Sequence, residues 1–194
     1  MKIIVATKNQ GKIREFKAIL PEYEILSMED IGIDIDVDED ADTFEGNAIK
    51  KAVEIMKVCG EITIADDSGL VVDALNGEPG VYSARYSGEH GNDTENNLLV
   101  LKKMENETNR KAKFVSAVAA AFPDGSHLCV TGEFHGEIDY EMKGTGGFGY
   151  DCIFYLPEYG LTSAEISAEE KNKISHRAKA LQKLKIKLEE ILKD

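Results

Sequence analysis

The stretch KIIVATKNQGKIREFKAIL, residues 2–20, indicates the fold class because a short apolar run passes directly into a helical pattern. KIIVA is typical of a strand, and Ile13, Phe16 and Leu20 recur on one face of a helix. Pro21 ends the helical run. The order strand, polar loop, helix predicts an α/β arrangement for the start of the chain.

Later segments continue this alternation and then pair locally. Residues 43–60 have apolar residues at helical spacing and stop at a glycine, and residues 61–75, EITIADDSGLVVDAL, are typical of a strand that runs into two aspartates. Residues 92–104 predict a helix, and PDGS at residues 123–126 predicts a hairpin turn. We therefore expect a mixed β-sheet flanked by helices. A basic amphipathic helix is expected at the C-terminus, with one face formed by Leu181, Leu184, Leu188 and Ile191.

The composition limits the class of protein. The chain has 194 residues, enough for one domain with a substantial core, and a formal net charge of −13. This charge argues against a nucleic-acid polymer as partner, because such binding depends on a basic surface. No apolar run approaches the ~18 residues of a membrane span, so we expect a soluble, cytoplasmic protein without a membrane partner. Three scattered cysteines predict buried reduced thiols, and the four histidines lack zinc-site spacing.

The acidic stretch DIDVDEDADTFE, residues 34–45, raises the question of calcium binding. Counted as a calcium loop, it has aspartates at positions 1, 3 and 5 and Glu45 at position 12. Position 6, which requires glycine, is Glu39. The alternation of apolar and polar residues predicts instead a strand over residues 31–38, with its aspartates solvated. Asp42 and Glu45 are expected to cap the helix that follows.

Two segments of the first half have the residues to bind a phosphorylated ligand. TKNQGK, residues 7–12, precedes a predicted helix, where free N–H groups, Lys8 and Lys12 favour a phosphate chain. The alternative is an ordinary polar connection with a capping asparagine. Asp66 and Asp67 are expected at the carboxyl end of a strand, where they can coordinate Mg²⁺ or accept a proton from water. The alternative is a solvated turn.

A glycine-rich segment of the second half combines backbone freedom with aromatic rings. GTGGFGYD, residues 144–151, has four glycines in six residues, which let a ligand approach the backbone closely. Phe148 and Tyr150 supply faces on which a base can stack. The alternative is a flexible turn that precedes a strand.

A basic segment near the C-terminus, EEKNKISHRAKA at residues 169–180, is the last candidate. Ser167 is expected to begin a helix, and a break at Ser175 would let His176 and Arg177 face one anionic or purine ligand. The alternative is a charged, solvated helix face.

Together these segments resemble one family, the inosine/xanthosine triphosphate pyrophosphatases, which remove deaminated purine nucleotides from the precursor pool. The resemblance implies a single pyrophosphatase domain over residues 1–194, an elongated mixed sheet with two lobes and a cleft between them, and a homodimer. It also implies Mg²⁺-dependent hydrolysis of ITP, dITP and XTP to the monophosphate and pyrophosphate. The matching pieces occur in the family's order over nearly the whole chain, as ATKNQGKIREF, DTFEGNAIKKA, ADDSGLVVDALNGEPGVYSARYSG, GTGGFGYDCIF and AEEKNKISHRAKAL.

The resemblance also implies roles for individual positions. Asp67 is implied as the proton acceptor and, together with Glu39, as a metal ligand. Ser68 is implied to contact the substrate, and Lys51 and Arg85 to lie near the cleft. The implied triphosphate-binding residues are Thr7, Lys8, Asn9, Gln10, Gly11 and Lys12. The implied base pocket consists of Phe148, Gly149, Tyr150, Asp151, Lys171, His176 and Arg177.

Three other functions stay open on the sequence alone. A non-catalytic nucleotide-binding module would have the same cleft, but Asp67 would be dispensable. A calcium-binding protein would depend on Glu45 and not on Glu39. A general nucleotide phosphatase would release orthophosphate in place of pyrophosphate.

Overall fold

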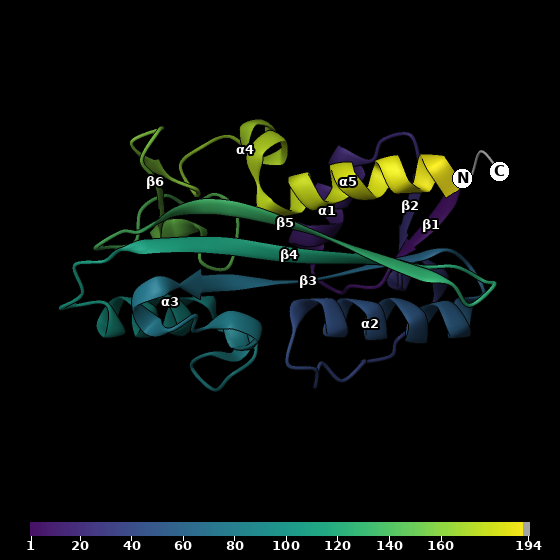
Figure 1. Cartoon of the computed structure of the whole chain (residues 1–194), viewed down its shortest axis with the longest axis horizontal. Helices are drawn as coiled ribbons and strands as arrows, with labels where there is room; N and C mark the ends of the chain where they lie inside the picture. The colour runs from purple at the N-terminus through teal and green to yellow at the C-terminus, as the bar shows by residue number, and fades with distance from the viewer. Residues whose placement is uncertain (192–194) are drawn as a thin grey trace. The chain divides into compact units, whose positions relative to one another are not determined.

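The computed structural model describes residues 1–191, within which seven strands form one mixed sheet in the order β2-β1-β3-β4-β5-β6-β7 (Figure 1). β1 pairs in parallel with β2 and β3, whereas β6 pairs antiparallel with β5 and β7. The predicted mixed sheet is therefore confirmed. The strands are β1 (Lys2–Val5), β2 (Glu24–Ser27), β3 (Thr63–Val72), β4 (Lys111–Ala121), β5 (His127–Ile138), β6 (Phe154–Leu156) and β7 (Leu161–Thr162).

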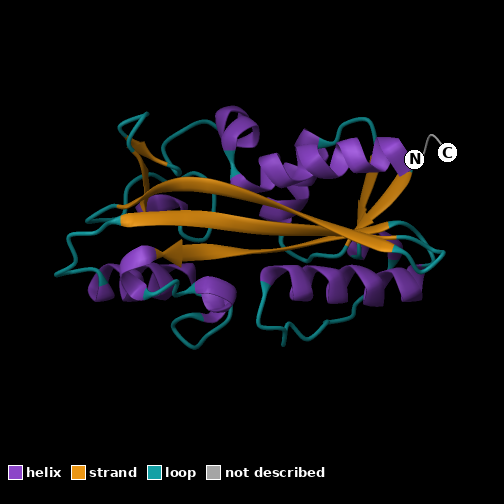
Figure 2. Ribbon diagram, in the orientation of Figure 1, coloured by secondary structure: helices purple, strands orange, loops and turns teal. Residues whose placement is uncertain are grey.

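Helices flank this sheet, as Figure 2 shows. The α-helices are α1 (Gln10–Ile19), α2 (Phe44–Cys59), α3 (Asp93–Lys103), α4 (Ala168–Ile174) and α5 (His176–Ile191). Short 3-10 helices are η1 (Glu29–Ile31), η2 (Asp73–Leu75), η3 (Gly80–Arg85) and η4 (Asp151–Ile153). Strand and helix alternate up to α3, and β4 and β5 then follow one another directly, as the sequence predicts.

The chain divides into two compact units. The first unit consists of residues 1–67, 116–132 and the described residues from 176 onward. The second unit consists of residues 68–115 and 133–175. The chain passes from one unit to the other within β3, β4 and β5, and again between Ser175 and His176.

The core of the first unit has two layers because successive residues of a strand point to opposite faces. Ile3, Val5 and Ile64 lie in one buried cluster with α1 and α5. Ile4 and Ala65 lie in another with α2. Strands that are buried on both faces explain the continuous apolar run of KIIVA.

The second unit has its own core, in which apolar residues of β3, β4 and β5 pack with α3 and β6. The Phe154 ring lies 4.5 Å from the Phe114 ring and 5.5 Å from the Phe134 ring, measured between centroids. Arg110 donates hydrogen bonds to the carbonyl groups of Met104, Ile138 and Asp139, which joins the end of α3 to the end of β5.

The predicted strand over residues 31–38 is wrong. Residues 32–43 contain neither helix nor strand, and Gly32 leaves η1 in the left-handed conformation, with φ of 71°. The apolar alternation has a different cause, because Ile31, Ile33 and Val37 pack against the cluster around α2. Ile35, which was expected on the same face, is exposed.

Helix ends are predicted better than strand ends. Ser167 caps α4, and Gly60 ends α2 in the left-handed conformation, both as expected. Asn9 caps α1 by accepting a hydrogen bond from the Lys12 N–H group, as in the alternative interpretation of residues 7–12. The expected break at Ser175 is also confirmed. The N-cap of α2, however, is Thr43 and not Asp42, since its hydroxyl accepts from the Gly46 N–H group.

Two other expectations need correction. The two aspartates were expected at the end of a strand, but β3 continues past them to Val72. Ile191 was expected on the apolar face of the last helix, but its side chain is 46% exposed. Leu181, Leu184 and Leu188 are fully buried, as predicted. The three cysteines are free thiols, but each is only partly buried.

Candidate active site

The middle of β3 places two adjacent carboxylates in different layers of the first unit. Asp66 shares the face of Ile64 and meets α1 and α5, whereas Asp67 shares the face of Ala65 and meets α2. Both side chains are buried. Strand alternation therefore gives neighbouring aspartates separate sets of partners.

Asp66 lies in a buried network of ion pairs. Its Oδ2 atom accepts hydrogen bonds from Arg177 Nε at 3.0 Å and Nη2 at 2.9 Å, and its Oδ1 atom lies 3.1 Å from Lys12 Nζ. Arg177 also pairs with Glu15 of α1. Because buried charges need partners, this network explains how four charged side chains are accommodated in the core.

Electrostatics keep Asp66 ionised. Burial opposes its charge, but Lys12, Arg177 and Lys51 outweigh burial and hold the pKa of Asp66 well below its usual range. Burial is the largest effect on Lys12 and lowers its pKa, although Asp66 partly compensates. For Arg177, burial is overcome by Asp66 and Glu15, which raise its pKa further.

Asp67 has the opposite environment. Its Oδ2 atom accepts a hydrogen bond of 2.9 Å from Asn47 Nδ2 of α2. Burial raises the pKa of Asp67, and the negative charge of Glu39 adds to this effect, although Asn47 and Lys51 counteract it. A buried carboxylate with a raised pKa is a good candidate for a general base, because its affinity for a proton is increased.

Glu39 lies in the irregular segment before α2 and forms an ion pair with Lys51 of that helix. Burial opposes its ionisation, but Lys51 and Lys12 lower the pKa of Glu39 overall. Within the described residues, no group of three or more His, Cys, Asp or Glu side chains is arranged to hold a metal ion. Glu39 and Asp67 are thus two carboxylates in one electrostatic environment, and not a complete protein cage.

Within the predicted phosphate loop, residues 7–9 belong to the connection between β1 and α1, and residues 10–12 form the first turn of α1. The Asn9 N–H group donates to Thr7 Oγ1 at 3.2 Å, and Asn9 Oδ1 accepts from the first turn of the helix. Lys8 is exposed and pairs with Asp34 at 2.7 Å and Asp36 at 2.9 Å. The acidic segment of the sequence therefore meets the predicted phosphate loop.

The start of α5 lies very close to β5. A Cβ atom built on Gly132 would lie 2.2 Å from the His176 carbonyl oxygen and 2.6 Å from the Ala180 nitrogen. Only glycine permits this approach. It brings His176 and Arg177, both buried, to the first unit at the point where the helix begins.

In the second unit, three glycines of the loop at residues 144–149 are required by contacts within the protein. Cβ atoms on Gly144 and Gly146 would meet the backbone of Ala164 at 2.8 and 2.7 Å, and one on Gly147 would lie 2.0 Å from Asp151 Oδ2. Gly149 differs, because its φ is +62° and no atom lies within 4 Å of a Cβ built there. Backbone freedom for a ligand thus explains at most one of the four glycines.

The residues after this loop are fixed by buried polar contacts. Asp151 Oδ2 accepts hydrogen bonds from Lys171 Nζ at 2.6 Å and from the Phe148 N–H group at 2.9 Å. Lys171 Nζ also lies 5.0 Å from the centre of the Phe148 ring. The Tyr150 hydroxyl donates to the Ser83 carbonyl at 2.7 Å, and burial raises the pKa of Tyr150.

The structure thus brings the sequence-predicted residues into two sets. Ser68 follows Asp67 directly but belongs to the second unit. Arg85 ends η3, with its guanidinium 5.4 Å from the Tyr82 ring centre. The set in the first unit contains residues 7–12, Glu39, Lys51, Asp66, Asp67, His176 and Arg177. The set in the second unit contains Ser68, Arg85, Phe148, Gly149, Tyr150, Asp151 and Lys171.

The sequence analysis missed Asn47 and Glu15, which hold Asp67 and Arg177 respectively. A signal exists for Asn47, because it is a polar residue on the apolar face formed by Phe44, Ala48 and Ala52. Glu15 carries no comparable signal, since charged residues are common in α1.

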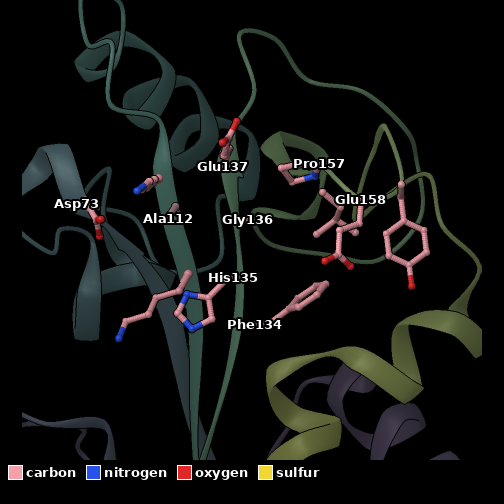
Figure 3. Close-up of a pocket in the computed structure, with 12 residues that line it drawn as sticks. Asp73, Ala112, Phe134, His135, Gly136, Glu137, Pro157 and Glu158 are labelled. Atoms are coloured by element: carbon pink, nitrogen blue, oxygen red, sulfur yellow. The ribbon is translucent and has the colours of Figure 1, made fainter.

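A hollow of about 660 Å³ in the second unit lies elsewhere (Figure 3). Phe134 and His135 of β5 border it, together with Pro157 and Glu158 beyond β6. None of its lining residues is a predicted site residue.

Across residues 1–191, no helix is both long and apolar enough to cross a membrane.

A mixed sheet flanked by helices, with buried carboxylates on an interior strand and lysines around them, defines an α/β protein with a charged polar centre. The chain belongs to the Ham1 family, whose sequence model matches residues 3–187. It is 49% identical to a protein of Clostridium perfringens named dITP/XTP pyrophosphatase, over 99% of each chain. A protein of Bacillus licheniformis with the same name is also 49% identical, over 97% of this chain and 98% of the relative.

Solved structures show the same fold. The Staphylococcus aureus Ham1 protein superposes with a TM-score of 0.88 at 45% identity and covers 97% of this chain and 98% of its own. A HAM1 protein from Coxiella burnetii also gives a TM-score of 0.88, at 38% identity, over 98% of this chain and 99% of its own.

Proposed function

We propose that this chain hydrolyses the deaminated purine nucleoside triphosphates ITP, dITP and XTP to the nucleoside monophosphate and pyrophosphate. The names of the C. perfringens and B. licheniformis relatives support the substrate and the reaction class. The observation that carries the mechanism is Asp67, a buried carboxylate with a raised pKa next to Lys12 and Lys51.

The triphosphate is assigned to residues 7–12. The N-terminus of α1 offers N–H groups and a partial positive charge to an anion, and Lys8 adds an exposed cation. Lys12 is already paired with Asp66, so its contribution is a fixed positive charge and not a mobile side chain. Fixed charges favour a transition state in which negative charge develops on the leaving pyrophosphate.

Asp67 is assigned the removal of a proton from the attacking water. Asn47 holds one carboxylate oxygen at 2.9 Å and so orients the group. The raised pKa increases its affinity for the proton, and the ordinary aspartate pKa from which it is raised, about 3.9, lies well below neutral pH. No covalent intermediate is needed, since water is the nucleophile.

Glu39 and Asp67 are the proposed ligands of Mg²⁺. In proteins this ion commonly takes one or two carboxylates and completes its coordination with water and substrate phosphates, which fits a pair that is not a full cage. Lys51 forms an ion pair with Glu39 and would neutralise part of the negative charge of this carboxylate. Bound there, Mg²⁺ would supply positive charge to the phosphate oxygens.

Base recognition is assigned to the loop of Phe148, Gly149 and Tyr150, with Asp151, Lys171 and His176. The Phe148 ring offers a stacking face, and N–H donors can meet the 6-oxo group of hypoxanthine, where an adenine amino group would face another donor. Arg177 was expected to donate here, but its guanidinium is held by Asp66 and Glu15. A direct contact of Arg177 or Ser68 with substrate therefore stays a prediction.

We also propose a cytoplasmic homodimer, on the basis of the family resemblance alone. Sedimentation of the purified chain would show twice the chain mass, and a monomer at micromolar concentration would contradict the dimer.

The reaction is tested by incubating the purified protein with Mg²⁺ and dITP, XTP, ITP, dATP or dGTP and identifying the phosphate product. Pyrophosphate from dITP, XTP and ITP, with slow turnover of dATP and dGTP, is expected. Orthophosphate would indicate a general phosphatase. The matched variant Asp67→Asn should lose roughly 10²–10⁴-fold in kcat, the range for general-base catalysis. Unchanged turnover in that variant would refute the role of Asp67.

A further inference from the structure

Helix α3 contains an unusual pair of buried asparagines. Asn96 and Asn97 are 1% and 2% exposed in the interior of the helix. Asparagine is a poor helix former, and a buried amide is costly unless its groups are bonded. We therefore expect these two side chains to contact groups outside the helix.

Asn97 forms a hydrogen bond with the loop that contains Phe148, Gly149 and Tyr150. Its Nδ2 group donates one hydrogen bond of 2.7 Å to the Asp93 carbonyl in its own helix and another of 2.8 Å to the Gly149 carbonyl. The Gly149 N–H group in turn donates to Asp93 Oδ2 at 2.8 Å. Both backbone groups of Gly149 are thus held by side chains one helical turn apart on α3.

Gly149 needs this support more than its neighbours. Its φ is +62°, and glycine exchanges readily between this region and negative φ values. No atom lies within 4 Å of a Cβ built at this position, so packing around the Cα atom does not restrain the conformation. Phe148 and Tyr150 on either side are anchored by Asp151 and Ser83. The Phe148 carbonyl accepts from the Asp151 N–H group at 3.3 Å, whereas the N–H and C=O groups of Gly149 itself are bonded by Asp93 and Asn97.

We propose that Asn97, assisted by Asp93, is a positioning residue for base discrimination, which acts by fixing the peptide groups on both sides of Gly149. This inference rests on the proposed function, which assigns the loop to the base. A loosened loop accommodates different bases more equally, because discrimination between oxo and amino groups requires donors at fixed positions.

The central test is Asn97→Asp, which keeps the shape of the side chain but removes the donor. Steady-state pyrophosphate release should show a KM for dITP about tenfold higher and a dITP-over-dATP preference about tenfold lower, the effect of losing the hydrogen bond to the Gly149 carbonyl. The kcat for dITP should change little, since the proposed function assigns this loop to the base and not to the phosphates. Hydrogen exchange of the amides at residues 148–150 should accelerate.

Two controls separate positioning from a general loss of stability. Asn96→Asp places the same charge on the same helix, but Asn96 bonds Ser87 and Ala84 and not the loop, so its base preference should be that of the wild type. Asp93→Asn keeps an acceptor for Gly149 and should preserve the preference, whereas Asp93→Ala should lower it. Asp93 is exposed, so these variants test the inference even if Asn97→Asp does not fold.

The outcomes are distinct for the two proposals. A folded Asn97→Asp protein with unchanged KM and unchanged preference would overturn the inference, as would an equal loss of preference in Asn96→Asp. Failure of the wild-type protein to release pyrophosphate from dITP would overturn the proposed function instead. In that case unchanged amide exchange at Gly149 in Asn97→Asp would still overturn the positioning of the loop.

Discussion

Asp66 and Asp67 show how much a single step along a strand changes a side chain. Asp66 is paired with Arg177 and Lys12, whereas Asp67 accepts a hydrogen bond from Asn47. The sequence identifies both residues as candidates. It does not separate a structural from a catalytic role, because Arg177 lies 111 residues away along the chain.

Replacing Asp66 should destabilise the protein. Asp66→Asn leaves Arg177 and Lys12 with one carboxylate fewer in a buried network, a change that typically costs about 3–5 kcal/mol. Urea unfolding at pH 7 measures this loss. Asp124→Asn in the exposed turn after β4 is the matched control and should change the stability far less. Equal stability of the Asp66 variant and the wild type would contradict the buried network.

Replacing Asp67 should have the opposite effect on stability. Because the pKa of Asp67 is raised in the folded state, its ionised form opposes folding, and metal-free Asp67→Asn should be more stable than wild type at pH 7. The protonated form carries no such penalty. The advantage of the variant should therefore shrink as the pH falls through the raised pKa, and vanish below the ordinary value of about 3.9. Urea unfolding with a chelator, as a function of pH, measures the difference.

Cys129 should be an unreactive thiol despite its partial exposure. Burial raises its pKa to about 11, with a further contribution from Glu45. Since only the thiolate reacts, alkylation by iodoacetamide should rise about tenfold per pH unit between pH 8 and 10. Peptide mass spectrometry at each pH measures the rate, and the denatured protein provides the control. A rate that levels off below pH 9 would contradict the raised pKa.

At the scale of elements, the sequence was sufficient to predict helix ends that are formed by contacts between residues close together along the chain. The caps of α1 and α4 and the end of α2 follow from nearby residues. The strand predicted over residues 31–38 was wrong because apolar alternation indicates only that alternate residues are buried. Ile33 and Val37 are packed against the cluster around α2 and need no strand partner for this. In the loop of residues 144–149, Gly144 and Gly146 are required by the backbone of Ala164, a contact distant in sequence that the motif does not indicate.

The approach of α5 to β5 gives a prediction at this scale. Gly132→Ala places a methyl group against backbone atoms of His176 and Ala180, which cannot move as a flexible side chain would. The helix must shift, and overpacking of this kind typically costs about 1–3 kcal/mol. Thermal unfolding measures the loss, and dITP turnover should fall with it if His176 contacts substrate. A variant with wild-type stability would show that the helix start is not tightly placed.

At the scale of the whole molecule, the class of fold was predictable and the strand order was not. Alternating strands and helices indicate a mixed sheet, but the position of β1 between β2 and β3 depends on pairings across the chain. The negative charge of −13 was also visible in the sequence. Its local effect was not, because nothing in the acidic segment indicates that Asp34 and Asp36 bind Lys8.

That pairing makes the acidic segment an intramolecular competitor of the substrate. Asp34 and Asp36 are tethered to Lys8 by the chain itself, so their effective concentration is constant and a triphosphate must displace them. Neutralising both, as Asp34→Asn with Asp36→Asn, should lower the KM for dITP at low ionic strength. Added KCl screens exposed charges and should remove the difference from wild type. A KM that is equal in both proteins at every salt concentration would show that the substrate never meets this competition.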